Sequence, residues 1–261
     1  ARPPFCSARR SPDPAPFPRA GSSRRFPYGS ETLAALARWR RVSDPSPKSK
    51  AGAPLCQPGR NCWRVEQAAR AALVVDAADY FRLARRAMLG ARSQILVMGW
   101  DLDTRIELIT KEEDGEAPVH LGALLQWLAR RNPGLRIHIL AWGGQSWRYL
   151  GRGTTLFRLA RWRFASPQID FRLDSKHPRE ASHHQKILVV DDAFAFCGGI
   201  DMTGSRWDTR AHRDKEPGRR RPTTHRRYGP WHDAAMAVDG AAARALGDLG
   251  RDRWRIARDE E

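Results

Sequence analysis

The chain has 261 residues, with 46 Lys and Arg against 29 Asp and Glu, and its formal net charge is +17. Hydrophobic residues make up 41% of it, which excludes a wholly disordered protein. Its apolar runs are far shorter than the roughly 18 residues of a membrane-spanning helix, so we expect a cytoplasmic or peripheral membrane protein. The positive charge indicates a soft attraction to phosphates or anionic lipid surfaces, without naming a partner.

The first 60 residues differ in character from the rest. They hold 11 of the 18 prolines together with many Ser and Arg, and they offer little apolar surface to bury. We therefore predict a disordered Pro/Arg-rich tail over residues 1–60 and a folded domain over residues 61–261.

Within that domain, short apolar runs typical of strands alternate with apolar residues at helical spacing. In chain order, these patterns predict strands at 63–65 and 72–75, a helix at 77–89, a strand at 94–100, a helix at 121–131, a strand at 136–141, a helix at 154–163, strands at 169–173, 184–190 and 193–197, a long polar surface loop at 205–230, a strand at 234–238 and a helix at 241–256. The alternation predicts an α/β fold with a mixed, mostly parallel central sheet flanked by helices on both faces.

One segment carries residues suited to phosphate chemistry. His184 and Lys186 would point to the same side of a strand about 7 Å apart, an arrangement that suits attack on a phosphate. The imidazole can act as nucleophile, and the ammonium can neutralise the non-bridging oxygens. Asp191 has the opposite parity at an Asp-Asp turn, which indicates that it holds the turn. A His-x-Lys alone is expected about 0.2 times by chance, but with Asp191 and Gly198-Gly199 at their fixed offsets the expectation falls to about 0.0001.

The spacing His184-x-Lys186-x4-Asp191-x6-Gly198-Gly199 resembles the HxKxxxxD motif of the phospholipase D superfamily. Further similar stretches are Gly-Trp-Asp-Leu-Asp at 99–103, Gly-Gly-Ile-Asp at 198–201, Arg-Trp-Asp at 206–208 and Pro-Trp-His-Asp at 230–233. Together they cover roughly residues 61–261 and look like the lipid-acting branch of phospholipases and cardiolipin-synthase-like proteins.

This resemblance implies a two-step phosphodiester exchange through a phosphohistidine, with a phospholipid substrate, no cofactor and no metal. It implies that His184, Lys186 and Asp191 are the catalytic residues, with His184 as the nucleophile and Lys186 as the phosphate clamp. Gly198 and Gly199 would permit close backbone approach. Asp201 would support the site, and Asp233 would orient the His184 ring.

Other polar residues have competing interpretations. Asp101 and Asp103 have a metal-like spacing but are better read as capping carboxylates, and His183 either supports the site or caps the strand entry. Cys197 is expected to fill the core. Cys6, Cys56, Cys62 and Cys197 show no metal-ligand spacing, and Cys56 and Cys62 could pair only in an oxidising compartment. Residues 219–221 could meet lipid headgroups or form a solvated loop.

The chain departs from the superfamily pattern because His184 alone has a lysine two residues later. Superfamily active sites join two such motifs, so the chain resembles an N-terminal half that needs a missing C-terminal half or a second copy. Two alternatives stay open. The first is a nuclease-like phosphodiesterase, which the positive charge favours but the Gly-Gly-Ile-Asp stretch opposes, so nucleic acid is not the expected partner. The second is a non-catalytic half-domain that binds anionic membranes or a partner chain.

Overall fold

The computed structural model describes residues 40–41, 54–109, 116–143, 166–178 and 180–258. Most of the predicted tail and the predicted helix at 154–163 lie outside the described residues, so the domain boundary at residue 61 stays a prediction. The elements of the described part, in chain order, are β1 (Arg40–Arg41), β2 (Arg70–Val75), α2 (Ala77–Leu89), β3 (Gln94–Gly99), α3 (Leu121–Arg131), β4 (Arg136–Trp142), β5 (Ile169–Asp174), β6 (Ile187–Val190), β7 (Phe194–Gly198), β8 (Ala234–Asp239) and α6 (Gly240–Ala257).

The strands form one eight-stranded sheet in the order β1-β2-β8-β7-β6-β3-β4-β5. An α/β fold with a mixed sheet is confirmed, but the expected predominance of parallel pairs is wrong. Only β3 with β4 and β4 with β5 are parallel, and the other neighbouring pairs are antiparallel. For β6 with β7 the physical reason is connection length, because the few residues between them cannot make the long crossover that parallel pairing needs. The predicted strand at 63–65 is also wrong, since these residues are irregular.

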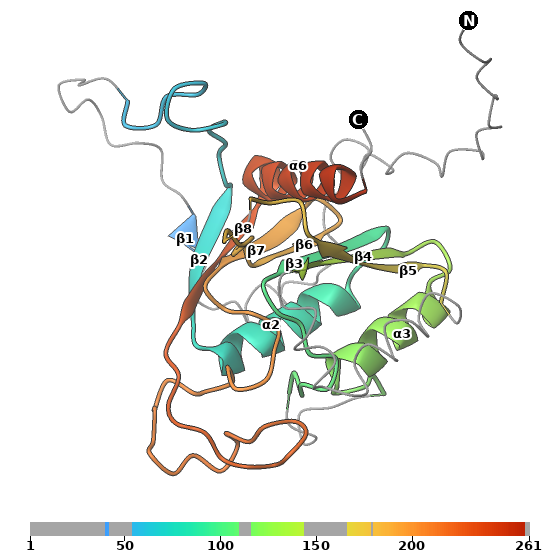
Figure 1. Cartoon of the computed structure of the whole chain (residues 1–261), viewed down its shortest axis with the longest axis vertical. Helices are drawn as coiled ribbons and strands as arrows, with labels where there is room; N and C mark the ends of the chain where they lie inside the picture. Colours follow the sequence, from blue (N-terminus) through green and yellow to red (C-terminus); the bar gives the residue numbers. More distant parts are fainter. Residues whose placement is uncertain (1–39, 42–53, 110–115, 144–165, 179, 259–261) are drawn as a thin grey trace, which may run out of the picture.

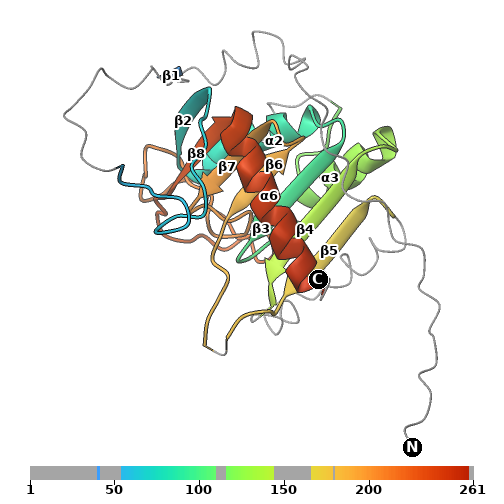
Figure 2. The ribbon, with the colours of Figure 1, turned by 90° about the horizontal axis from the view of Figure 1, so that it is seen from above.

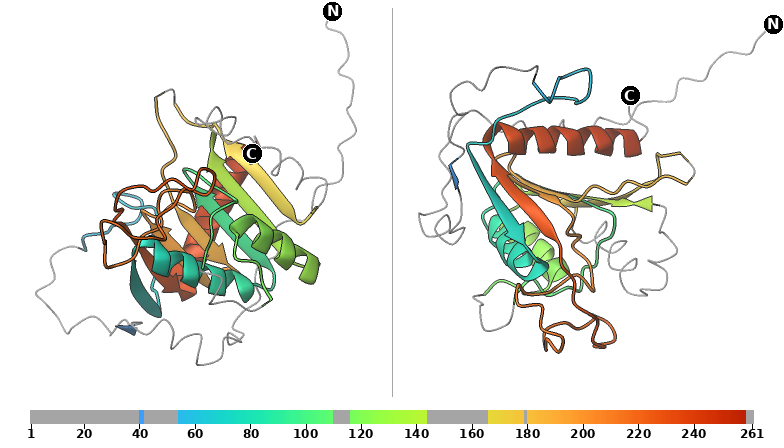
Figure 3. Two further views of the ribbon diagram at one scale, coloured as in Figure 1. Left: turned by 90° about the horizontal axis from the view of Figure 1, so that it is seen from below. Right: turned by 90° about the vertical axis from the view of Figure 1, so that its left-hand side faces the viewer.

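Helices cover both faces of the sheet, as expected. Helix α6 lies across one face, and α2 and α3 lie on the other (Figures 1 and 3). Alternation along β3 accounts for the two layers, because Leu96 and Met98 pack under α6 whereas Ile95 and Val97 face the layer of α2 and α3. The core is therefore divided by the sheet into two apolar clusters.

Helix α6 runs across the sheet, as the view from above in Figure 2 shows. A Cβ on Gly250 would stand 2.1 Å from Leu96 Cδ2, so a larger residue there would separate the helix from β3. Trp254 is buried and meets the ring of His138 edge-on, with 4.9 Å between centroids. Burial lowers the pKa of His138 to about 4, because the charged imidazolium is desolvated.

The predicted long loop at 205–230 is irregular, but it is not only solvated surface. Asp208 and Arg219 are both buried within it, and Arg219 Nη1 donates to Asp208 Oδ2 at 2.9 Å. Asp208 also accepts hydrogen bonds from the N–H groups of Thr209 and Trp231. The loop therefore folds around one carboxylate. No helix in the described part of the chain is long and apolar enough to cross a membrane.

Candidate active site

His184 and Lys186 lie in an irregular segment directly before β6, which begins at Ile187 rather than at the predicted residue 184. The strand starts late because the residues before Ile187 are polar, while the strand itself is buried on both faces. The N–H of Gly198 donates to the carbonyl of Lys186 at 3.2 Å, so the segment is attached to the end of β7. The two motif residues thus stand at the edge where β6 and β7 meet.

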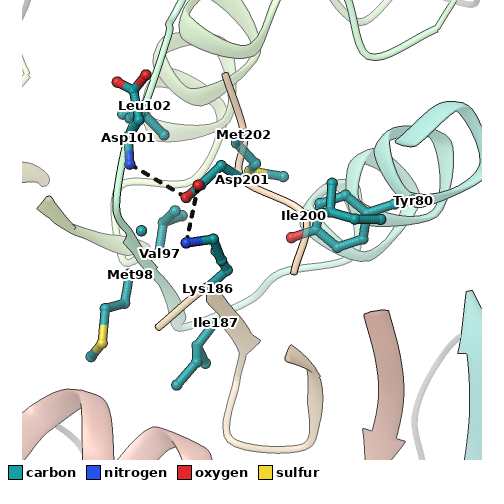
Figure 4. Close-up of a pocket in the computed structure, with 11 residues that line it drawn as sticks. Tyr80, Val97, Met98, Asp101, Leu102, Lys186, Ile187, Ile200, Asp201 and Met202 are labelled. Carbon is teal, nitrogen blue, oxygen red and sulfur yellow. Dashed lines mark hydrogen bonds and ion pairs between the residues drawn. The ribbon is translucent and has the colours of Figure 1, made fainter. Parts of the chain in front are cut away.

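Lys186 is buried, and its ammonium has two neighbours with fixed positions. Nζ lies 3.1 Å from Asp201 Oδ2 and donates to the carbonyl of His184 at 3.0 Å. Figure 4 shows the ion pair between Lys186 and Asp201. The pocket here has a volume of about 10 Å³, room for one water rather than for a phosphodiester. The ion pair with Asp201 and the hydrogen bond to the His184 carbonyl orient the Lys186 ammonium.

Asp201 is built into the structure by the Gly-Trp-Asp stretch upstream. Its Oδ1 accepts hydrogen bonds from the N–H groups of Trp100, at 2.9 Å, and Asp101, at 3.3 Å. Burial raises the pKa of the Asp201 carboxyl, although the nearby Lys186 ammonium and these hydrogen bonds oppose the rise. The supporting position predicted for Asp201 thus corresponds to the carboxylate that pairs with Lys186.

The His184 side chain is exposed and lies against Trp100. The two rings meet edge-on with 5.7 Å between centroids, and Lys186 Nζ stands 5.9 Å from the centroid of the same indole. Trp100 in turn stacks on Trp142, with centroids 5.5 Å apart and planes inclined by 14°. Nothing in the sequence singles out these two tryptophans, although Trp100 lies in the Gly-Trp-Asp-Leu-Asp stretch at 99–103.

Gly198 and Gly199 are required by the protein's own packing. A Cβ on Gly198 would stand 2.5 Å from the carbonyl oxygen of Ala234, and one on Gly199 would stand 2.0 Å from Asp233 Oδ1. The glycines therefore allow the backbone of β8 and the carboxylate of Asp233 to approach the motif. Among the described residues, however, no hydrogen bond joins Asp233 to His184. Asp233 Oδ1 instead accepts the N–H of Ala234 at 2.8 Å.

Asp191 lies at the other end of β6, away from His184, so its place among the catalytic residues is corrected. Its carboxylate accepts hydrogen bonds from the N–H groups of Arg92, Ser93 and Gln94 and from Ser93 Oγ. Its φ of 54° is in the left-handed region, as is the 53° of Asp192. Asp191 holds the turn and the start of β3 together, as its parity in the sequence indicates.

The remaining candidates have structural partners. Asp101 accepts a hydrogen bond from Thr203 Oγ1 at 2.9 Å, and Asp103 pairs with Arg105 at 2.8 Å. His183 lies 3.5 Å from Asp174 Oδ2, next to Arg253. Burial raises the pKa of the Cys197 thiol, which is typical of a packed cysteine. Cys56 and Cys62 are both free thiols.

Curated proteins named phospholipase D are similar to this chain in sequence. No family model matches the chain. Phospholipase D C of Dictyostelium discoideum is 27% identical over 71% of this chain, and Phospholipase D beta 2 of Arabidopsis thaliana is 28% identical over 80% of it. These alignments cover only 13% and 24% of the two relatives. The crystal structure of Nuc from Salmonella typhimurium, a phospholipase D family member, matches with a TM-score of 0.41 at 18% identity, covering 71% of this chain and 95% of that one.

The chain spans less than a quarter of the length of these two curated relatives. These curated relatives support the assignment of this chain to the phospholipase D superfamily.

Proposed function

We propose that the chain is one half of a phospholipase D-type phosphodiesterase or phosphatidyltransferase that acts on phospholipids. The observation that carries the proposal is the exposed imidazole of His184 beside the buried ammonium of Lys186. The ion pair with Asp201 orients this ammonium. An accessible nucleophile next to a fixed positive charge is what attack on a phosphate anion requires.

In the proposed first step, a ring nitrogen of His184 forms a bond to phosphorus while the bond from phosphorus to the leaving alcohol oxygen breaks. A general acid gives that oxygen a proton. In the second step, water or another alcohol attacks the phosphohistidine, loses a proton to a base and releases His184. The two outcomes are hydrolysis and transfer.

Lys186 would stabilise the charge on the non-bridging phosphate oxygens. An ammonium has three N–H donors, and two of them are directed to Asp201 and to the His184 carbonyl. Within the described part of the chain, the third N–H is left for a phosphate oxygen. Because Asp201 and the carbonyl fix the other two, little reorganisation would be needed when substrate arrives.

The general acid of the first step would come from a second His-x-Lys motif, supplied by another copy of this chain or by a C-terminal half. A missing general acid typically costs about 10²–10⁴-fold in rate. We therefore expect activity per molecule to fall on dilution, in step with the dimer fraction measured by light scattering. Full activity from a confirmed monomer would contradict the two-half hypothesis.

The nucleophile is tested by trapping the covalent intermediate. The chain is incubated with vesicles of phosphatidylcholine labelled in the phosphate and then quenched in alkali, where phosphohistidine is stable and phosphoserine is not. At a concentration where light scattering shows the dimer, we expect label on the unmodified chain and on His225→Asn, an exposed loop histidine, but not on His184→Asn. Label that persists in His184→Asn would refute the assignment. Turnover of DNA without turnover of vesicles would instead favour the nuclease-like alternative.

A further inference from the structure

A second cluster of ionisable groups lies at the beginning of α2, where the end of the 205–230 loop returns to the sheet. It consists of Asp76, His212 and His232, whose nearest ligand atoms all lie within 4.8 Å of one another. Asp76 Oδ1 is 2.8 Å from His232 Nδ1, and Asp76 Oδ2 is 3.0 Å from His212 Nε2. The two imidazole rings meet edge-on with 4.8 Å between centroids.

The carboxylate of Asp76 is turned away from its ordinary partner. Asp76 is the N-cap of α2, a position where an Asp side chain usually accepts a hydrogen bond from the first turn of the helix, but no such bond is formed. The residue is 1% exposed, and its Oδ2 accepts no hydrogen bond from the described residues, despite the nearby ring. A buried carboxylate oxygen without a donor is costly unless a cation compensates for it.

The orientation of His212 is set from its other side. Its Nδ1 lies 3.2 Å from Asp208 Oδ2, the buried carboxylate that also accepts from Arg219 and Trp231. When Nδ1 of His212 donates to Asp208, the lone pair of Nε2 is left on the side of the ring that faces Asp76. Histidines that bind a metal through one ring nitrogen usually donate the N–H of the other to a carboxylate, as His212 does to Asp208.

We propose that Asp76, His212 and His232 form a binding site for one zinc ion. Ligand atoms of a tetrahedral zinc site with bonds of about 2.0–2.1 Å stand about 3.3 Å apart. The two rings stand 2.8 Å and 3.0 Å from different oxygens of Asp76, so zinc binding would widen both separations slightly. Two imidazoles with one carboxylate suit zinc better than the oxygen-preferring magnesium or calcium. The exposed side of His232, whose side chain is 69% accessible, leaves room for water as the fourth ligand.

The role of this zinc would be structural. It would fasten the end of the long loop to the first turn of α2, and His232 directly precedes Asp233, whose carboxylate lies against Gly199. The ion would thus hold one wall of the candidate active site without contacting the phosphate. The inference does not depend on the proposed function, because it concerns residues to which that chemistry assigns no part.

Metal binding is tested with Co²⁺, which replaces Zn²⁺ and absorbs visible light when it is bound in a tetrahedral site. Titration of the metal-free full chain should give one equivalent of tetrahedral absorption, and added Zn²⁺ should remove it. His232→Ala should weaken Co²⁺ affinity at least about 10-fold, and because its side chain is exposed the variant should still fold. His225→Ala, in the same loop, is the matched control and should bind as the unmodified chain does.

Thermal unfolding gives a second measurement. Zn²⁺ should raise the midpoint of the unmodified chain and of His225→Ala, and raise that of His232→Ala much less, since only a metal bound to the folded state stabilises it. Absence of stoichiometric Co²⁺ binding would overturn the proposal. Equal affinity in the unmodified chain and in His232→Ala would also overturn it, because the metal would then lie elsewhere.

Discussion

Replacement of Asp201 by Asn tests whether the charge facing Lys186 holds this site together. The amide keeps an oxygen that can accept the N–H groups of Trp100 and Asp101, so the main loss is the negative charge beside Nζ. Lys186 is 7% exposed and Asp201 2%, so the variant leaves an ammonium buried without its partner. Breaking a buried ion pair on one side costs about 3–5 kcal/mol, and we expect the free energy of unfolding to fall by that amount.

The opposite replacement, Lys186→Met, should cost less, and its cost should depend on pH. Without Lys186, the pKa of Asp201 rises further, because the ammonium is the largest influence that opposes burial. A folded-state pKa above the unfolded value means that the folded state binds more protons between the two, so stability falls as pH rises through that window. The deficit of Lys186→Met relative to the unmodified chain should therefore shrink as the pH is lowered from about 8 to about 5.

Urea unfolding followed by circular dichroism, at both pH values, measures these free energies. Lys215→Met, an exposed lysine of the long loop, is the matched control and should change stability by less than about 0.5 kcal/mol. If Asp201→Asn also stays within about 0.5 kcal/mol, Lys186 and Asp201 do not form a buried pair and the reasoning fails.

Two further replacements test the turn and the glycines, both by urea unfolding. Asp191→Ala removes four hydrogen bonds and places alanine at a φ of 54°, so we expect the free energy of unfolding to fall by about 2–4 kcal/mol. Asp191→Asn should lose clearly less, because asparagine tolerates this φ. Equal losses in the two variants would contradict the role of Asp191 in the turn. Gly198→Ala should lower the free energy of unfolding by about 1–3 kcal/mol, because its Cβ would collide with the β8 backbone. Gly229→Ala has open space around it and should leave stability nearly unchanged. A Gly198→Ala variant of unchanged stability would contradict the close approach of β8.

The sequence predicted the helices better than the sheet, for a physical reason. Both α2 and α3 begin and end at the predicted residues, because helical periodicity is a local property of the chain. Strand direction depends on which strands become neighbours, and β2 pairs with β8 across most of the chain. Sequence alternation contains no such information, although the short connection between β6 and β7 did indicate an antiparallel pair.

The candidate site could be predicted in part. The motif located His184 and Lys186, and parity along the strand placed Asp191 at the turn. Asp201 lies in the Gly-Gly-Ile-Asp stretch at 198–201, but its ion pair with Lys186 could not be read from the sequence. The fold brings its carboxylate to the Lys186 ammonium. Asp76 and His232 are 156 positions apart, so no local spacing could have revealed their cluster.

The turn held by Asp191 and Asp192 also affects the order in which the protein can assemble. The strands that follow Lys186 are joined by a short turn, so β6 and β7 can pair as soon as both have left the ribosome. Strand β2 has its main partner in β8, and the hydrogen bond from Arg70 to Asp239 joins residues 169 positions apart. The segment that carries the motif can therefore be in place early, while β2 stays unpaired with β8 until nearly all of the chain has been made.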